Sequence, residues 1–174
     1  MPAASKAYKN WHAQGYSAVI SHAKQQGWNI ILAGSPAQIE IELANEIEKN
    51  CPFVTNMVGK SSIKQLLALL DKTDLVIAPD TGPTHMANAM NTPVIGLYAH
   101  HNPDRTGPYN YRHYVVSAYE QAIQKEHRLP IQELPWRTRV KNKNAMLLIS
   151  SEQVISMFDK VSKNLMTNPN KNSI

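Results

Sequence analysis

The sequence predicts an α/β fold, a parallel sheet flanked by helices, and two observations carry the prediction. Short apolar runs alternate along the chain with longer segments whose apolar residues recur at three- and four-residue spacing. Strand, helix and strand repeated in this order give a parallel sheet with helices on both faces. In such sheets ligands bind beyond the carboxyl ends of the strands, so we expect the site on the loops that lead from strands into helices.

The predicted elements follow one another in a regular order. The runs NIILAG, FVTNMV, DLVIAP, TPVIGLY and HYVVSA predict strands at residues 29–34, 53–58, 74–79, 92–98 and 113–118. Helical spacing predicts helices around Tyr16 to Ala23, Ile39 to Ile47 and Ile63 to Leu70. A last helix is expected to begin near Ser151, and its apolar stripe is interpreted as core or docking surface: Val154, Ile155, Phe158, Val161 and Leu165.

Length and composition indicate one domain. The 174 residues can bury a core but fall short of the usual two-domain size. We expect residues 1–165 to form the domain and residues 166–174 to be a disordered tail. The single cysteine, Cys51, cannot staple the fold or supply a metal cluster, which favours a reducing compartment. Neither a signal peptide nor an apolar run of about 18 residues is visible, so a cytoplasmic location is expected, at most peripheral on a membrane.

The charge balance favours an anionic partner. Lysine and arginine exceed aspartate and glutamate by 18 to 13, which gives a net charge of +5. The basic residues are scattered, so the excess favours an anionic small ligand or a membrane surface over nucleic acid. The basic segment at residues 127–144 could approach anionic lipid or a phosphorylated acceptor, although a solvated loop is the commoner arrangement. Its relevant residues are Trp136, Arg137, Arg139, Lys141 and Lys143.

The motif DTGPTHM directly follows the third expected strand. Pro83 suits the first turn of a helix, which places the N-cap at Gly82 and directs the N–H groups of Thr84 and His85 outward. Free N–H groups, the partial positive charge of a helix start, the hydroxyls of Thr81 and Thr84, and a glycine that permits close backbone approach all suit a phosphate. The motif therefore predicts an anion site.

Asp80, the first residue of the motif, requires a different role because a carboxylate repels a diphosphate. Hydrogen bonding to neutral sugar hydroxyls, or to the backbone of the loop, fits better. Alternatively, Asp80 and Thr84 only cap the helix while His85 packs beneath it, which is the commoner arrangement for an arbitrary loop of this kind. The motif alone leaves both interpretations open.

A series of segments carries a family resemblance. In chain order these are S-K-A-Y-K-N-W, N-I-I-L-A-G, V-G-K-S-S-I, D-L-V-I-A-P-D-T-G-P-T-H-M-A, P-V-I-G-L-Y and G-P-Y, within residues 3–118. Their order resembles the C-terminal half of the glycosyltransferase family 9 enzymes, the ADP-heptose:lipopolysaccharide heptosyltransferases. The resemblance implies the GT-B architecture of two facing Rossmann-like domains, with this chain as the donor-binding C-terminal domain.

The resemblance implies roles for single residues. Ser5 and Lys9 would contact the diphosphate of the donor, and a lysine ammonium suits phosphate as a point charge. The alternative for Lys9 is a solvated surface charge. Asp80 would hold hydroxyls of the transferred sugar. The diphosphate itself would be lined by Thr81, Gly82, Thr84 and His85.

The resemblance also points to residues outside these two segments. Met57 and Gly59 correspond to the family segment that borders the adenine, although V-G at the end of a strand is also an ordinary turn. Arg105 could read a phosphate or be a solvated loop cation. His100 and His101 are adjacent, so in extended chain they point to opposite sides and cannot chelate one ion together. Since no D-x-D motif is present either, we expect no metal and no cofactor.

The implied function is donor binding for an inverting transfer of heptose from ADP-heptose to the lipopolysaccharide inner core, at the cytoplasmic face of the inner membrane. Family members have an N-terminal domain that binds the acceptor and carries the general base. This chain has no room for it, so we expect a fragment or truncated product with no catalytic residue of its own.

Other functional classes remain open at this point. A non-catalytic nucleotide-sugar binding module has the same sequence features as a donor domain. Another GT-B sugar-nucleotide enzyme, such as an epimerase, shares the fold. An oxidoreductase on a Rossmann fold is disfavoured because no G-x-G-x-x-G follows any expected strand.

Overall fold

A computed structural model describes residues 1–4 and 6–167 of the chain. Its strands are parallel and fall into two groups. In the first, β1 (Ile31–Leu32) pairs with β2 (Thr55–Asn56). In the second, β4 (Val94–Tyr98) lies between β3 (Val76–Pro79) and β5 (Val116–Ser117). The strands occur where the sequence predicts them, but the described sheet is interrupted between β1 and β3.

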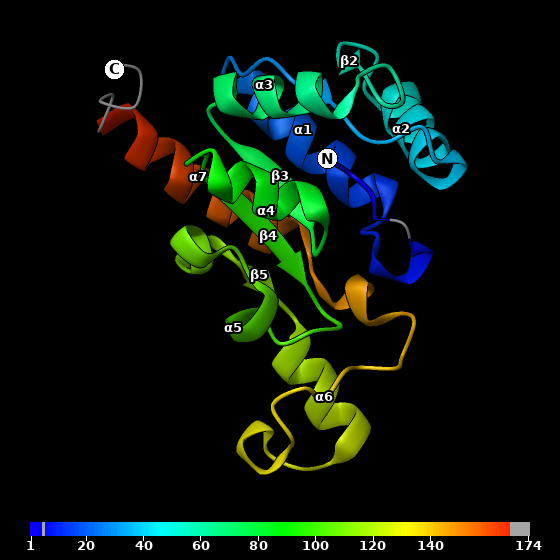
Figure 1. Cartoon of the computed structure of the whole chain (residues 1–174), viewed down its shortest axis with the longest axis vertical. Helices are drawn as coiled ribbons and strands as arrows, with labels where there is room; N and C mark the ends of the chain where they lie inside the picture. Colours follow the sequence, from blue (N-terminus) through cyan, green and yellow to red (C-terminus); the bar gives the residue numbers. More distant parts are fainter. Residues whose placement is uncertain (5, 168–174) are drawn as a thin grey trace.

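Helices connect and cover the strands (Figure 1). The longer ones are α1 (Ala13–Gln25), α2 (Gln38–Asn50), α3 (Ile63–Lys72), α4 (Gly82–Ala89), α6 (Tyr119–His127) and α7 (Ser151–Thr167). A single turn, α5 (Pro103–Thr106), follows β4. Short 3₁₀ helices lie at η1 (Ala7–Lys9), η2 (Tyr109–Tyr114), η3 (Ile131–Glu133) and η4 (Ala145–Leu148).

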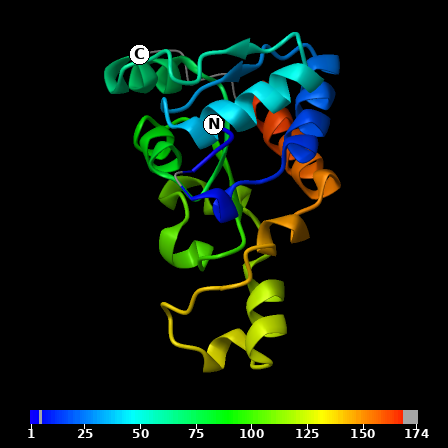
Figure 2. The same ribbon diagram turned by 90° about the vertical axis from the view of Figure 1, so that its right-hand side faces the viewer.

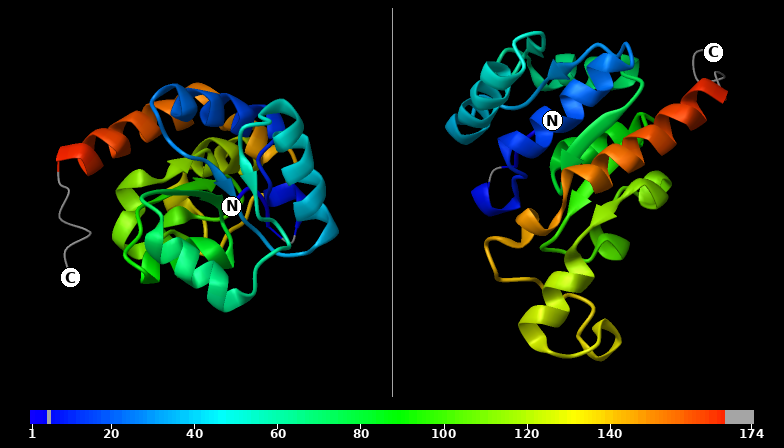
Figure 3. Two further views of the ribbon diagram at one scale, coloured as in Figure 1. Left: turned by 90° about the horizontal axis from the view of Figure 1, so that it is seen from above. Right: turned by 180° about the vertical axis from the view of Figure 1, so that it is seen from behind.

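Two buried clusters show that helices cover both faces of the strands. On one face, Ile95 and Leu97 of β4 pack with α1 and α7 residues such as Val19 and Val154. On the other face, Val76 and Ala78 of β3 pack with α3 and α4 residues, which include Leu70 and Ala87. In the right-hand view of Figure 3, which is seen from behind, α1 and α7 lie side by side in front of the strands. The predicted fold class, a Rossmann-like parallel sheet flanked by helices, is therefore confirmed.

The N-terminal ends of these helices have local causes in the sequence. Ser62 and Gln65 form a capping box at the start of α3, in which each side chain accepts a hydrogen bond from the other residue's N–H group. At the start of α1, Nδ1 of His12 accepts from the N–H of Gly15. Trp11, one residue earlier, is 1% exposed and donates its ring N–H to the carbonyl of Ile149. Trp11 thereby fixes the amino-terminal segment against the segment before α7.

Several boundaries differ from the predicted ones, and the first two strands are shorter, at residues 31–32 and 55–56. The fifth strand covers only residues 116–117, because Tyr114 ends the 3₁₀ helix η2 before it. Helix α7 continues to Thr167, two residues beyond the predicted end of the domain at Leu165. The rest of the predicted disordered tail lies outside the described residues.

The segment from α6 to η3 projects away from the strands, as Figures 1 and 2 show. Leu129 in this segment is exposed, and Trp136, which follows η3, is 58% exposed. The buried thiol of Cys51 is free. Among the described residues no helix is long and apolar enough to cross a membrane.

Candidate functional site

A pocket of about 680 Å³ opens beyond the carboxyl ends of β1 and β3. Four segments line it: the amino-terminal residues up to Lys9, the loop after β1 with the start of α2, the residues that begin α3, and the β3–α4 loop. The DTGPTHM motif supplies Asp80, Thr81, Gly82 and His85 to the wall. The pocket thus lies at the edge of the sheet where a parallel α/β protein is expected to bind its ligand.

Helix α4 directs its amino terminus at this pocket. Its N-cap is Thr81, so Gly82 is the first helical residue, and the predicted N-cap at Gly82 is wrong by one position. Pro83 occupies the first turn as expected. Among the described residues no side chain caps the helix, and its first turn contains no acidic residue. The partial positive charge of this helix start is therefore not neutralised by a carboxylate of its own turn.

The side chain of Thr84 does not face the pocket. It is fully buried, and its hydroxyl donates to the carbonyl of Pro79 at 2.6 Å. Its N–H donates to the carbonyl of Thr81 at 3.2 Å, so the expected outward orientation of both groups is wrong. The Thr81 hydroxyl lies 3.4 Å from the Thr84 hydroxyl and is the donor, because the Thr84 proton is already engaged. Thr84 therefore stabilises the motif through its hydrogen bonds to Pro79 and Thr81.

Gly82 leaves open space at the start of α4. A Cβ added there would meet no heavy atom within 4 Å among the described residues. The neighbouring protein atoms therefore do not require a glycine. A ligand that approaches the backbone closely would require one.

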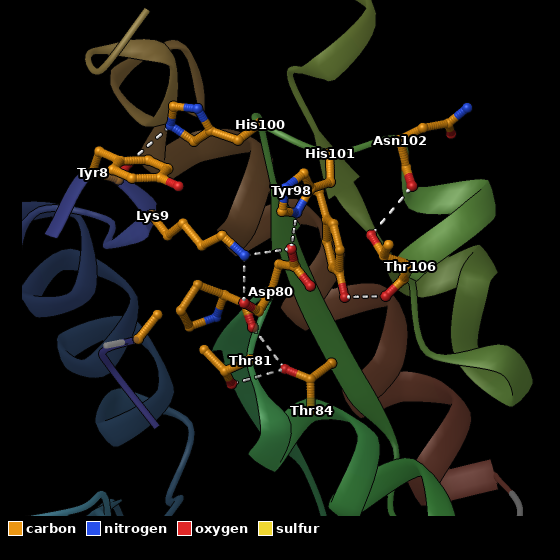
Figure 4. A network of polar contacts seen from close by, with 12 residues as sticks. Tyr8, Lys9, Asp80, Thr81, Thr84, Tyr98, His100, His101, Asn102 and Thr106 are labelled. Carbon is orange, nitrogen blue, oxygen red and sulfur yellow. Dashed lines mark hydrogen bonds and ion pairs between the residues drawn. The ribbon is translucent and has the colours of Figure 1, made fainter. Parts of the chain in front are cut away.

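A compact ionic cluster stands beside the helix start (Figure 4). Nζ of Lys9 lies 2.9 Å from Oδ2 of Asp80, and Nδ1 of His101 contacts the same oxygen. Lys9 also lies 3.5 Å from the backbone carbonyl of Asp80. All three side chains are less than one-fifth exposed. The sequence predicts that Lys9 and Asp80 both belong to the site and therefore lie near each other. It does not predict the direct ion pair between them.

This cluster controls the charge of Asp80. Burial by itself would raise the pKa of Asp80, but the hydrogen bonds and positive charges of His101 and Lys9 outweigh it and hold the pKa below its usual value. The negative charge of Asp80 raises the pKa of the neighbouring Tyr98, in addition to the larger effect of burial. The carboxylate at the pocket is therefore ionised and compensated, so that it repels a phosphate less than an isolated aspartate would.

The two adjacent histidines do point in different directions, as the sequence predicted. His100 is buried, and its ring nitrogens face the carbonyls of Val140 at 3.1 Å and Tyr8 at 2.8 Å. Tyr8 precedes Lys9 in η1, so His100 links the lysine-bearing segment to the segment after η3 (Figure 4). His101 instead turns toward Asp80. Sequence reasoning weighed these histidines as metal ligands, and their loop as a segment that faces the donor sugar or the acceptor, and missed both contacts.

Glu40 is a further pocket residue that sequence reasoning missed. It is 8% exposed, and its carboxylate accepts hydrogen bonds from the N–H of Ser35 at 2.9 Å and from the Ser35 hydroxyl at 2.5 Å. A Cβ on Gly34 would come within 2.5 Å of Oε2 of Glu40, so a side chain at position 34 would displace the carboxylate from this position. The Gly-Ser pair directly after a strand, with an acid in the next helix, was the available signal.

Other predicted site residues lie elsewhere. The described lining of the pocket does not include Met57, Gly59 or Arg105. Gly59 has a φ of 73° and packs behind Pro36, which does line the pocket. Arg105 lies close enough to Tyr119 to influence its pKa. Ser5 falls outside the described residues.

The described side chains also bear on metal chemistry. Among them no group of three or more histidine, cysteine, aspartate or glutamate residues is placed to hold a metal ion. Among the described lining residues the positively charged groups are the ammonium groups of Lys6 and Lys9, together with the start of α4.

Comparison with known proteins identifies the family. The family model described as "Glycosyltransferase family 9 (heptosyltransferase)" matches residues 1–134. The chain belongs to glycosyltransferase family 9. The lipopolysaccharide core heptosyltransferase OpsX of Haemophilus influenzae is 49% identical over 161 residues, which cover 92% of this chain and 46% of that protein. The chain of family 9 described here thus spans about half the length of this relative.

Solved structures of this family have the same fold. A family 9 glycosyl transferase from Veillonella parvula superposes with a TM-score of 0.74 at 20% identity, covering 94% of this chain and 45% of that one. Heptosyltransferase WaaC of Escherichia coli, solved with ADP, gives a TM-score of 0.68 at 19% identity, covering 92% and 42%. At these identities the likeness concerns the fold, and it agrees with one Rossmann-like half of a GT-B enzyme.

Proposed function

We propose that this family 9 chain is the donor-binding part of a heptosyltransferase, and that its pocket holds ADP-heptose for inverting transfer to the lipopolysaccharide inner core. The observation that carries the proposal is the meeting of Lys9 with the uncapped start of α4 at one pocket. An ammonium and a helix terminus together suit a diphosphate. The named activity of OpsX and the ADP in the WaaC structure support the choice of nucleotide and sugar.

Different parts of the pocket suit different groups of the ligand. The diphosphate is assigned to Lys9, Thr81 and the Gly82 backbone, where positive charge is concentrated. The buried carboxylate of Glu40 can accept hydrogen bonds from neutral hydroxyls, and so suits the ribose. Asp80, with its charge compensated, is assigned to hydroxyls of the heptose. A volume of about 680 Å³ is within the range of pockets that enclose small ligands.

The part of this chain in the transfer reaction is electrostatic. An acceptor hydroxyl attacks the anomeric carbon while ADP departs from the opposite face, and negative charge grows on the leaving diphosphate. Preorganised donors aimed at that charge contribute roughly 3 to 4 kcal/mol each to such a step. The general base and the acceptor site are assigned to the remainder of a full-length family member. Transfer to the lipopolysaccharide core, at the cytoplasmic face of the inner membrane, is accordingly proposed for the whole protein.

The test is calorimetric titration with ADP, GDP, UDP and ADP-heptose in the absence of divalent metal. We expect selective binding of ADP, and tighter binding of ADP-heptose than of ADP. Asp80→Ala should bind ADP at least as well as the parent protein, because a carboxylate near the phosphates is removed, but should lose the advantage of ADP-heptose. Equal binding of the three nucleoside diphosphates would refute the nucleotide assignment. An undiminished preference for ADP-heptose in Asp80→Ala would refute the role of Asp80.

A further inference from the structure

The segment after α6, residues 128–144, lies at the opposite end of the molecule from β2 (Figures 1 and 2). It contains the 3₁₀ helix η3, and most of its side chains are exposed. We call it the basic arm, because five of its residues are basic and one is acidic, which gives the arm +4 of the chain's net charge of +5. The basic residues are Arg128, Arg137, Arg139, Lys141 and Lys143, and the acidic one is Glu133.

The basic side chains of the arm are available to a partner. All five are exposed, and within the described part of the chain none of them forms an ion pair. Helix α6, which leads into the arm, contains Lys125 and the acidic residues Glu120 and Glu126. The Glu126 carboxylate accepts hydrogen bonds from the backbone N–H groups of Lys141 at 2.9 Å and Asn142 at 3.1 Å. The positive charge of the arm is therefore not balanced by ion pairs.

An aromatic side chain lies in a turn of the arm. The N–H of Thr138 donates to the carbonyl of Pro135 at 2.8 Å, so Trp136 and Arg137 occupy the two central positions of this turn. Trp136 is 58% exposed, and Leu129 of the same arm is 44% exposed. Tryptophan has an apolar ring and a polar N–H, and it is enriched where proteins contact the boundary between lipid and water. The arm thus presents apolar as well as positively charged side chains to solvent.

Hydrogen bonds hold the arm against the rest of the fold. The hydroxyl of Tyr119 donates to the carbonyl of Thr138 at 2.8 Å. The buried residue Val140 donates its N–H to the carbonyl of His100 at 3.0 Å. Because His100 follows β4, and β3 and β4 are parallel, the base of the arm lies at the carboxyl edge of the strands, where the pocket also opens. A surface held in this way loses less conformational entropy on binding than a flexible loop does.

We propose that the basic arm is a docking surface for an anionic lipid bilayer. Each lysine or arginine near an anionic membrane strengthens binding by about fivefold, and an exposed tryptophan adds apolar contact at the level of the headgroups. A site for one phosphate group requires donors that converge. The basic side chains are instead spread from Arg128 to Lys143, and none of them belongs to the described lining of the proposed nucleotide pocket. They therefore suit an extended anionic surface better than a single phosphate.

This inference deepens the proposed function, on which it rests only in the choice of a membrane as the anionic surface. Docking through the arm would bring the carboxyl edge of the strands, and with it the proposed nucleotide pocket, to the membrane at which transfer is proposed. The experiments below measure lipid binding in the absence of nucleotide. Failure of the arm to bind lipid would leave the donor site unaffected, and failure of ADP binding would leave the arm unaffected.

Vesicle binding measures the contribution of the positive charges. Sedimentation with vesicles of phosphatidylglycerol and phosphatidylcholine is compared with sedimentation with phosphatidylcholine alone. The variant Arg137→Glu, Arg139→Glu reverses two charges of the arm, and Lys160→Glu, Lys163→Glu reverses two exposed charges of α7 as the matched control. The affinity for anionic vesicles should fall by at least about tenfold in the arm variant and by about twofold or less in the control. A rise in salt to about 0.5 M should release the parent protein.

The fluorescence of Trp136 gives a readout that does not depend on the charge variants. Of the other two tryptophans, Trp11 is buried and Trp28 is half-buried. Brominated lipid quenches a tryptophan that enters the bilayer, so anionic brominated vesicles should quench the parent protein. In Trp136→Phe this quenching should be lost while most of the sedimentation remains, because phenylalanine retains an apolar ring.

Four results would overturn the proposal. The first three are no sedimentation with anionic vesicles, equal losses in the two double variants, and undiminished quenching in Trp136→Phe. The fourth is release of the protein from vesicles by glucose 6-phosphate at constant ionic strength, which would assign the arm to a phosphorylated sugar instead of a bilayer.

Discussion

Helices α4 and α2 both begin at the proposed nucleotide pocket, and they begin differently. The first turn of α4 contains no acidic residue, and Lys9 lies beside the Asp80 that precedes it. The first turn of α2 contains Glu40, whose buried carboxylate accepts two hydrogen bonds from Ser35. A helix start is thus an anion site only where the chain has not placed its own anion there. The pocket accordingly has a positive end at α4 and a hydrogen-bond-accepting end at α2.

Of the changes at the two ends of the pocket, removal of Lys9 should have the largest effect on the affinity for ADP. In Lys9→Ala the ammonium is lost and the charge of Asp80 is no longer compensated, so both changes oppose a diphosphate. A hydrogen bond to a charged group contributes about 1.5 to 3 kcal/mol, so the affinity for ADP should fall by roughly 10- to 100-fold. Calorimetry measures it, with exposed Lys163→Ala as the charge-matched control.

The double variant Lys9→Ala, Asp80→Ala sharpens the same test. Because it removes the uncompensated carboxylate together with the ammonium, it should bind ADP more tightly than Lys9→Ala alone. If the change in ADP-binding free energy of the double variant equals the sum of the two single changes, the ion pair between Lys9 and Asp80 does not influence phosphate binding.

Gly82→Ala should separate binding from stability. A methyl group there enters open space, so the free energy of unfolding should stay within about 1 kcal/mol of the parent value and could rise, because alanine favours helix. The same methyl group would stand where the diphosphate approaches the backbone, and the affinity for ADP should fall by about tenfold. Urea unfolding measures the free energy of unfolding, and calorimetry on the same preparation measures the affinity for ADP. Unchanged affinity would place the phosphates away from the start of α4.

Much of this arrangement could be predicted from the sequence, for local reasons. Helix α4 follows from Pro83 after an apolar strand, and the position of the pocket follows from the parallel order of strands. The inward orientation of the Thr84 side chain could not be predicted from the sequence, since a threonine at a helix start can form a hydrogen bond either to solvent or to the preceding strand. The contact of Lys9 with Asp80 joins residues 71 positions apart and depends on tertiary packing.

The place of the break in the sheet could not be predicted for a different reason. Periodicity identifies each strand by itself, and the strands at β1 and β3 were expected and are present. Which edges pair depends on the order of strands across the sheet, and that order leaves no trace in the spacing of apolar residues. The same limit hid the role of Glu40, which is defined by its approach to Gly34.

Glu40→Gln should weaken the other end of the pocket by a smaller amount. An amide can accept only one of the two bonds that Ser35 donates, so the ribose end would be rearranged while the start of α4 stays intact. ADP should bind about fivefold more weakly, and inorganic pyrophosphate should bind as before. Glu42→Gln, an exposed change in the same helix, is the matched control. Equal losses for ADP and pyrophosphate would contradict the division of the pocket into two ends.

The smallest effect should appear in the pH dependence of stability. The pKa of Asp80 is lower in the folded protein than its ordinary value of 3.8, because His101 and Lys9 outweigh the opposing effect of burial. The unfolded chain therefore binds a proton first as the pH falls, so the stabilisation by Asp80 is fully present above pH 3.8 and is lost as the pH drops through the lower, folded pKa. Asp80→Asn lacks this contribution, and its deficit in free energy of unfolding should narrow below pH 3.8. Unfolding in urea between pH 7 and pH 3 measures both proteins, and a constant difference would mean that the charge of Asp80 is not what the cluster stabilises.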